Sequence, residues 1–320
     1  MSIRWVIPGG GAEVSTREEA IPALLARSDG FLWLDLCPPE EGDRQRLREA
    51  FGFHPLALED AFRARERPKV DAYPDHYFIA FYAVGYETED GLSLRPLHIF
   101  AGPRYVVTIC SQPIPEVEQV IARWQGPERQ RAPTPGSVVY DLLDAVVDGY
   151  FPALDRIAEE VEELEERLFA GGDGRLVEAI FRTRKTLLEL RRVVAPQREV
   201  INLLLRHELP VFRPEDMAYF QDLYDRLVRL IESIDLYRDM LSGALESYLS
   251  LQSNRLNEIV KVLTIASIIL MADALVAGIY GMNFRYMPEL EWPWGYPMAL
   301  LMMAGISAGP ALFFRRRGWL

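Results

Sequence analysis

The hydrophobic positions of this chain gather in two long apolar runs near its C-terminus, after a long and mostly polar stretch. Residues 262–281 carry one formal charge, Asp273, and residues 296–314 carry none. A helix needs about 20 apolar residues to cross the core of a bilayer, so both runs have spanning length. The pattern therefore predicts two transmembrane helices, joined by a polar connection over residues 282–295.

Asp273 is the one feature that favours the alternative, a pair of buried helices in a soluble core. On the insertion scale an Asp at mid-membrane costs about 2.5–3.5 kcal/mol, whereas each Leu, Ile or Val contributes about 0.3–0.6 kcal/mol in favour. The first run has nine such residues, or about 4 kcal/mol on that scale. This balance favours membrane insertion.

Basic residues flank the two runs on one side. Arg255 and Lys261 precede the first run and a basic tail, residues 315–320, follows the second, whereas the connection has only Arg285. The positive-inside rule then places both termini in the cytoplasm and the connection outside. We expect a multi-pass protein of the cell's inner (plasma) membrane.

The region before the spans divides into three predicted segments. Residues 1–135 alternate strand-like and helical patterns, which is typical of an α/β domain. Strands are predicted at 4–7, 31–36, 77–84, 94–100 and 105–110, and helices at 16–27, 40–51 and 115–124. The basic stretch 63–69 and the proline-rich stretch 132–136 are predicted to be loops or domain junctions.

Residues 136–213 are predicted to form acidic antiparallel helices, and residues 214–281 a stalk helix that continues into the first span. No proline occurs between Pro214 and Pro288, so one helix of 67 residues, about 100 Å long, is expected from 215 to 281. Residues 141–166 hold ten acidic side chains and one basic one. Such a run forms either a solvated helix face or a site that collects divalent cations.

Composition and charge exclude several function classes. The chain of 320 residues has 47 acidic against 35 basic side chains, a net charge of -12, which disfavours nucleic-acid binding. Cys37 and Cys110 are too few to build a disulfide scaffold. The triple glycine at 9–11 lacks the Lys and Ser/Thr of a phosphate loop, and the four histidines have no metal-site spacing. We therefore expect neither an enzyme nor an organic cofactor.

Two spans cannot enclose a polar path, so a transport function requires a homo-oligomer. The first span carries a stripe of small, polar or flexible side chains at helical spacing, opposite an Ile/Leu face. Its members are Asn257, Val260, Thr264, Ser267, Met271, Ala274 and Gly278. The stripe is either a packing seam between helices or the lining of a narrow pore, and its polar members favour the pore.

In the second span, Gly305 and Gly309 form a small-xxx-small pair that we expect to pack against the first span.

Gly281, Met282 and Asn283 stand at the outer end of the long helix. Gly281 is expected to end the helix with a positive φ, and Asn283 to turn its amide carbonyl toward a central axis. A ring of such carbonyls would hydrogen-bond the waters of a hydrated cation. This arrangement fits Mg²⁺, which holds its water shell tightly.

The C-terminal region resembles the CorA family of magnesium and cobalt transporters. Gly281-Met282-Asn283 is similar to the family's GMN triplet and is followed by MPEL at residues 287–290. HPLALED at 54–60, RPKVDAY at 67–73 and the tail GWL at 318–320 also look like family segments. The resemblance implies a funnel-shaped homopentamer with an α/β cytosolic domain, a long stalk helix and two C-terminal transmembrane helices.

The resemblance also implies roles for individual residues. Asn283, with Gly281 and Met282, would form the selectivity filter for transported Mg²⁺ or Co²⁺. The implied pore lining is Asn257, Val260, Leu263, Ser267, Met271 and Ala274, with Val260, Leu263 and Met271 as hydrophobic gate candidates. The implied regulatory Mg²⁺ ligands between subunits are Asp60 and Asp222, with Glu59 and Asp144 as candidates for a second site.

Two departures from the family pattern lie within the first span. Family members commonly carry Pro where this chain has Ala272, and an apolar residue where it has Asp273. Asp273 lies one residue off the stripe, so we hypothesise that it adds a cation site at mid-pore, at the rim of the lumen or against the next protomer.

Two alternatives stay open at this point. One is a zinc transporter of the same superfamily, for which Asp273 would be a reason for a different ion preference. The other is a membrane-anchored oligomeric scaffold or sensor whose spans only tether it to the bilayer and which carries no flux.

Overall fold

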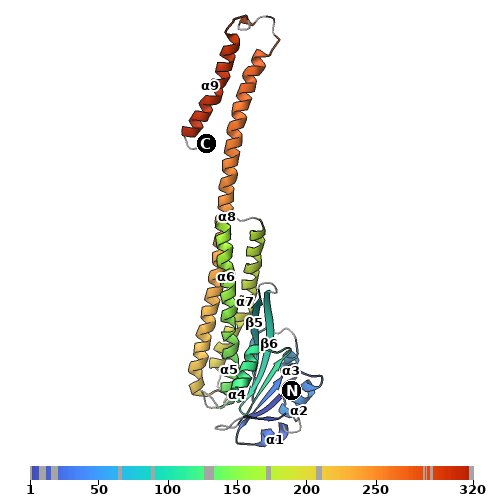
Figure 1. Ribbon diagram of the computed structural model, residues 1–320. Coiled ribbons are helices and arrows are strands. Elements are labelled where there is room, and N and C mark those ends of the chain that lie inside the picture. Colours follow the sequence, from blue (N-terminus) through green and yellow to red (C-terminus); the bar gives the residue numbers. More distant parts are fainter. Residues whose placement is uncertain are drawn as a thin grey trace. The chain divides into compact units, whose positions relative to one another are not determined.

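The computed structural model (Figure 1) describes residues 2–6, 12–15, 21–63, 67–87, 91–125, 133–170, 174–206, 211–283, 285, 287–288 and 291–316. The chain divides into two compact units, Met1–Gly243 and Ala244–Leu320. One helix, α8 (Met217–Tyr280), belongs to both units.

The first unit is built on one mixed sheet of seven strands. Its order is β2-β1-β3-β7-β6-β5-β4, and only β3 and β7 run parallel. The strands are β1 (Ser2–Val6), β2 (Ala12–Ser15), β3 (Phe31–Leu36), β4 (Lys69–Ala72), β5 (Tyr77–Glu87), β6 (Gly91–Gly102) and β7 (Tyr105–Cys110). The strands predicted at 31–36 and 105–110 have these bounds, and the other three predicted strands correspond to β1, β5 and β6.

Alternate residues of β3 show that both faces of this sheet are covered. Leu32, Leu34 and Leu36 belong to a core with residues of three short helices, α1 (Ile21–Ala26), α2 (Asp43–Phe51) and α3 (Pro55–Ala61). On the other face, the ring of Trp33 packs edge-on against Trp124 of α4 (Pro115–Gln125). Strand side chains alternate between faces, so β3 is hydrophobic at every position except Asp35 because both of its faces are covered.

Helices α5 (Pro135–Asp148), α6 (Tyr150–Phe169) and α7 (Gly174–Arg206) pack on the face that carries α4 (Figure 1). The buried Tyr150 hydroxyl donates to the Tyr82 carbonyl of β5 and contacts Gln197, which also donates to that carbonyl over 3.2 Å. These bonds satisfy polar groups inside an otherwise apolar layer. The helical layer and the sheet therefore form one unit.

Two stretches that were predicted to be loops contain the first residues of a helix or a strand. Thr134 caps α5, its hydroxyl accepting from the Ser137 amide over 3.0 Å, so Pro135 and Gly136 belong to the first turn of the helix. Lys69, the last residue of the predicted loop 63–69, begins β4, which pairs antiparallel with β5. Residues 64–66, 126–132 and the predicted helical residues 16–20 lie outside the described part of the chain.

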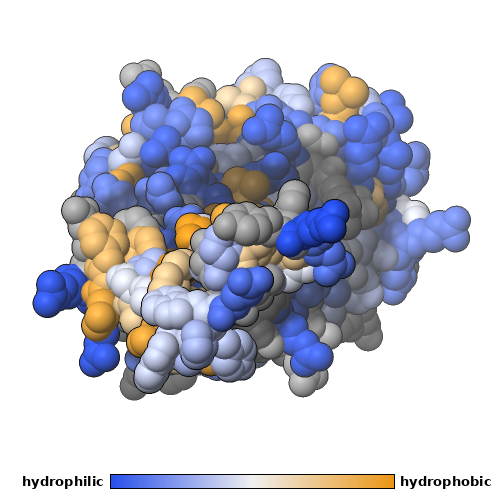
Figure 2. Space-filling model, turned by 90° about the horizontal axis from the view of Figure 1, so that it is seen from above, coloured by the Kyte–Doolittle hydropathy of each residue, from blue (hydrophilic) through white to orange (hydrophobic). Residues whose placement is uncertain are grey.

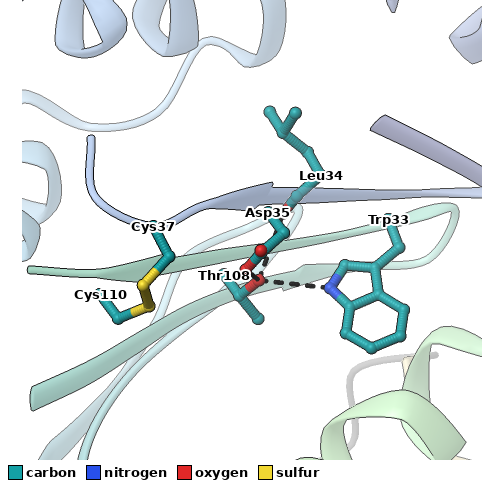
Figure 3. Close-up of a disulfide and its surroundings, with 6 residues drawn as sticks. All are labelled: Trp33, Leu34, Asp35, Cys37, Thr108 and Cys110. Atoms are coloured by element: carbon teal, nitrogen blue, oxygen red, sulfur yellow. Dashed lines mark hydrogen bonds between the residues drawn. A yellow bond between two sulfur atoms is a disulfide. The ribbon is translucent and has the colours of Figure 1, made fainter. Parts of the chain in front are cut away.

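Figure 3 shows that the two cysteines form a disulfide bond. Cys37 follows β3 directly and Cys110 ends β7, and their Cα atoms are 4.9 Å apart because the two strands are parallel neighbours. Beside the bond, the Thr108 hydroxyl donates to Asp35 over 2.6 Å and accepts from the Trp33 indole over 3.3 Å. A single bridge fits the expectation that the cysteines do not build a disulfide scaffold, although the pairing itself was not predicted.

His98 of β6 makes the stability of the first unit depend on pH. Its side chain is 2% exposed and stacks on Phe78. Burial lowers its pKa to about 4, with Lys69 acting in the same direction and Asp60 against it. Between pH 6.5 and 4 the unfolded chain therefore binds a proton here that the folded chain does not.

We accordingly expect the first unit to lose about 3 kcal/mol of stability as the pH falls through this window. The measurement is hydrogen exchange of β5 and β6 amides across the pH range, with His98→Gln for comparison. Equal pH slopes in the two proteins would show that His98 is not the cause.

The second unit pairs the last part of α8 with α9 (Gly295–Arg316). In Figure 1 these two helices lie side by side, and both are long and apolar enough to cross a membrane. Large apolar side chains are exposed on both, including Leu270, Leu275 and Leu301, and orange hydrophobic groups reach the surface in Figure 2. Exposed apolar surface of this extent is typical of a face that meets lipid or another subunit.

Candidate pore and cation sites

The predicted stripe on α8 is uncovered within the chain. All of its members are exposed or half-buried, and Met271 reaches 72%, while the neighbouring gate candidate Leu263 is exposed at 64%. The buried positions of this part of α8, Ile265 and Val276, lie on the opposite side of the helix. One side of α8 thus meets α9, while the stripe faces away and is free to line an axis.

Two hydroxyls of the stripe have fixed orientations. Thr264 donates to the Val260 carbonyl over 2.7 Å, and Ser267 donates to the Leu263 carbonyl over 2.8 Å. Because each hydroxyl hydrogen is used within the helix, the free lone pairs of each oxygen point outward as acceptors. The polar part of the stripe is therefore suited to cations and their waters rather than to anions.

The prediction that Gly305 and Gly309 pack against the first span is wrong. Both glycines are exposed, and a Cβ added to either would meet nothing within 4 Å. The half-buried positions of α9 include Met303, Ile306 and Ser307. Of these, Ser307 bonds to Asp273 of α8, so this side of α9 is the one toward α8.

Asp273 lies in this contact between α8 and α9. The Ser307 hydroxyl donates to its Oδ2 over 2.6 Å, and its Oδ1 is buried without a hydrogen-bond partner in the described part of the chain. Asp273 is therefore on the side of α8 opposite the stripe. This position does not support a cation site in the lumen. The hydrogen bond from Ser307 to Asp273 instead joins the two spans.

Gly281 ends α8 without the positive φ that the sequence predicts. The Gly281 amide donates to the Ala277 carbonyl over 2.9 Å, as in an α-helix. The Met282 amide donates to the Ile279 carbonyl over 3.2 Å, so the helix ends in a tighter turn of the 3₁₀ type. A Cβ on Gly281 would lie 3.0 Å from the Ala277 oxygen, which explains the value of glycine here. Asn283 follows directly and is exposed.

The acids Glu59 and Asp60 of α3 each have a basic partner. Glu59 pairs with Arg63, and Asp60 accepts from Lys69 over 2.7 Å, with its side chain 16% exposed. The pKa of Lys69 is raised, since its bonds to Asp60 and Asp71 outweigh the opposing effect of burial. Asp60 and Lys69 thus form a partly buried ion pair.

Asp144 and Asp222 meet at one guanidinium, that of Arg226 on α8. Arg226 pairs with Asp144 and with Asp148 on α5, and its Nε lies 3.2 Å from Asp222. Three carboxylates thus surround the Arg226 guanidinium, and the charge of Arg123 also acts on Asp148. Burial and the charge of Asp144 raise the pKa of Asp148, with Arg226 acting against them.

The members of this cluster differ in accessibility. The Asp222 side chain is 62% exposed, whereas that of Asp144 is 23% exposed. Within the described residues no three His, Cys, Asp or Glu side chains are placed to hold a metal ion together. The glutamates of α6 are mostly exposed, and Val161, Leu164 and Leu168 are buried, as expected for a solvated helix face.

Arg226, Lys69 and Ser307 are contacts of the candidate residues that the sequence did not single out. Arg226 lies four residues after Asp222, which is the spacing of a helical ion pair and a signal that the sequence contains. Lys69 and Ser307 are brought to Asp60 and Asp273 by tertiary contacts alone.

Comparison with known proteins supports a transport role for this architecture. The model of the family "CorA-like Mg2+ transporter protein" matches residues 28–316. The cobalt/magnesium transport protein CorA of Thermotoga maritima is 35% identical over 285 residues, which cover 86% of this chain and 79% of the relative. The divalent cation transporter CmaX of Pseudomonas aeruginosa is 28% identical, with 98% of this chain and 94% of that protein covered.

The fold agrees with a solved relative over the whole chain. The complete structure of the CorA magnesium transporter from Methanocaldococcus jannaschii superimposes with a TM-score of 0.84 at 27% identity, covering 100% of this chain and 99% of the other.

Proposed function

Since the chain belongs to the CorA-like Mg²⁺ transporter family, we propose that it carries hydrated Mg²⁺, and also Co²⁺, through a pore lined by the stripe of α8. The family consists of ion transporters rather than enzymes. Uptake would follow the membrane potential, which acts on a dication with about 4.6 kcal/mol per 100 mV. No nucleotide hydrolysis is then needed.

The observation that carries the proposal is the orientation of α8. Its stripe points away from α9, its hydroxyls present acceptor oxygens, and Asn283 stands exposed at its end. Neutral acceptors recognise the water shell of a cation without holding it as tightly as carboxylates do. Asn283, with Gly281 and Met282, is the proposed filter, and Val260, Leu263 and Met271 are the proposed gate.

Several copies of the chain are required to close such a path. We take the assembly to be a homopentamer, as implied by the family resemblance, with both termini in the cytoplasm. Arg315 and Arg316 at the end of α9 support this orientation through the positive-inside rule.

Cytosolic Mg²⁺ is proposed to close the channel by binding between subunits. Asp222, whose side chain is 62% exposed, is the proposed ligand that meets Asp60 of another copy. Carboxylates that face each other across an interface repel, and a bound dication converts this repulsion into attraction. Glu59 and Asp144 would contribute to a second site.

Replacing Asp222 by alanine should weaken this inhibition. We expect the internal Mg²⁺ concentration that halves uptake to rise at least about fivefold, because one ligand of the inhibitory ion is lost. Asp225→Ala is the matched control, since Asp225 is an Asp on the same helix that bonds to Gln221 rather than to Arg226. The measurement is dye-monitored uptake at a series of internal Mg²⁺ concentrations, and equal shifts in both variants would contradict the role of Asp222.

The proposed ion is tested by uptake into proteoliposomes with Mg²⁺, Co²⁺, Ni²⁺ and Zn²⁺ in competition. Mg²⁺ uptake that Co²⁺ inhibits is the expected result. Preferred Zn²⁺ uptake would identify a zinc transporter instead, and no flux of any of the four ions would leave only a scaffold or sensor.

A further inference from the structure

A cavity of about 510 Å³ lies in the first unit, and none of the pore or acidic residues discussed above line it. It is bordered by the β5–β6 hairpin, the start of α4 and the junction between α5 and α6. Its volume falls within the range of about 300–1,000 Å³ that is usual for small-molecule sites. Its charged lining residues are Arg95, Arg156 and Glu116.

Two of these residues have buried atoms without partners. Arg95 and Glu116 are 17% and 18% exposed, and their closest atoms, Nη2 and Oε1, are 3.9 Å apart, too far for a hydrogen bond. In the described part of the chain the Arg95 Nε and the Glu116 Oε2 are buried with no hydrogen-bond partner. The two side chains therefore form only a long ion pair, and an anionic ligand with hydroxyl groups would give the guanidinium and the carboxylate the hydrogen bonds that this pair does not supply.

Two glycines make room for these charged side chains. A Cβ on Gly85 would lie 3.1 Å from the Arg95 Nη2 and 2.7 Å from the Ser93 hydroxyl. A Cβ on Gly149 would lie 2.9 Å from the Glu116 Oε1. A larger residue at either position would displace these charged side chains.

The second arginine is held in place at the rim. Arg156 of α6 donates through Nη1 to the Tyr86 carbonyl over 2.9 Å, and the Tyr86 hydroxyl donates to Glu160. Two arginines against one glutamate give the lining a charge of +1, in a chain whose net charge is -12. A locally positive cavity in an acidic protein favours an anionic ligand.

We propose that this cavity binds a small phosphate ester that carries hydroxyl groups, of the sugar phosphate or nucleotide class. The guanidinium groups of Arg95 and Arg156 bind the phosphate, because planar N–H pairs match its oxygens. Glu116 accepts from the hydroxyls, which an inorganic anion lacks. The ligand thereby pairs with the charged groups of both side chains at once.

The test is calorimetric titration of the full chain in detergent and Mg²⁺-free buffer, with ribose 5-phosphate and with inorganic phosphate as separate probes. We expect saturable binding, with ribose 5-phosphate at least tenfold tighter than phosphate. Arg95→Gln and Arg156→Gln should each weaken its binding at least tenfold. Arg167→Gln, an exposed arginine at the far end of α6, should have no effect.

Glu116→Gln separates the two halves of the site. Because Glu116 binds the hydroxyls and not the phosphate, this variant should bind ribose 5-phosphate less than threefold more tightly than inorganic phosphate. Arg156→Gln is expected to leave the fold intact, since Arg156 is exposed on its helix. The proposal is overturned if the wild-type chain shows no saturable binding, if both arginine variants bind as well as wild type, or if inorganic phosphate binds as tightly as ribose 5-phosphate.

Discussion

Replacing Asn283 by alanine is expected to lower Mg²⁺ uptake at least tenfold. The substitution removes one carbonyl per subunit from the end of α8, where Asn283 is exposed directly after the last helical turn. Hydrogen bonds to charged partners contribute about 1.5–3 kcal/mol each, so the loss of one such contact in the entering complex corresponds to a tenfold to hundredfold effect.

The matched control for this prediction is Asn254→Ala. Asn254 is also exposed on α8 but lies outside the stripe, so its replacement should leave uptake unchanged. Both variants are measured by radiotracer uptake into proteoliposomes, with the protein content and the oligomer peak matched by size-exclusion chromatography. Uptake by Asn283→Ala at the wild-type rate would remove Asn283 from the filter.

Placing a lysine at Ser267 should stop uptake almost completely, by at least 100-fold. Even at the dielectric constant of water, a single positive charge about 5 Å from a dication costs about 1.7 kcal/mol, and every subunit adds one. Because lysine at mid-span also lowers insertion by about 2.5–3.5 kcal/mol, the assembled oligomer must be confirmed before flux is compared.

Asp273→Asn provides the contrast on the other side of the same helix. The substituted amide side chain retains an oxygen that accepts from Ser307, so flux and its pH dependence should stay within about twofold of wild type. If Asp273→Asn abolished uptake while Ser267→Lys did not, the lining face of α8 would have to be reassigned to the side that meets α9.

The sequence predicted those helices and strands whose hydrophobic pattern is periodic and extends over many residues. The stripe on α8 and the two spans have spacings that only a helix satisfies, and β3 and β7 are hydrophobic on both faces because helices cover both. β4 and α3 were missed because they have four and seven residues. Segments this short owe their structure to pairing and packing rather than to local preference.

The partners of the candidate residues were the least predictable part of the site. Asp60 pairs with Lys69 because α3 lies beside the edge of the sheet, and Asp273 meets Ser307 because α9 folds back along α8. Gly305 and Gly309 form a motif that several faces of a helix could use, and the sequence does not say which face meets α8. The cysteine pairing likewise depends on β3 and β7 being neighbours.

The central claim is that α8 lines a path for divalent cations, and its most direct test is Mg²⁺ uptake under an imposed membrane potential. Proteoliposomes of the wild-type chain are loaded with a Mg²⁺ dye, and an inside-negative potassium diffusion potential is applied. Uptake that rises with the potential in the wild type and is absent in Ser267→Lys is the predicted result. Mg²⁺ entry that is equal in the two proteins, or no greater than in protein-free liposomes, would contradict the claim.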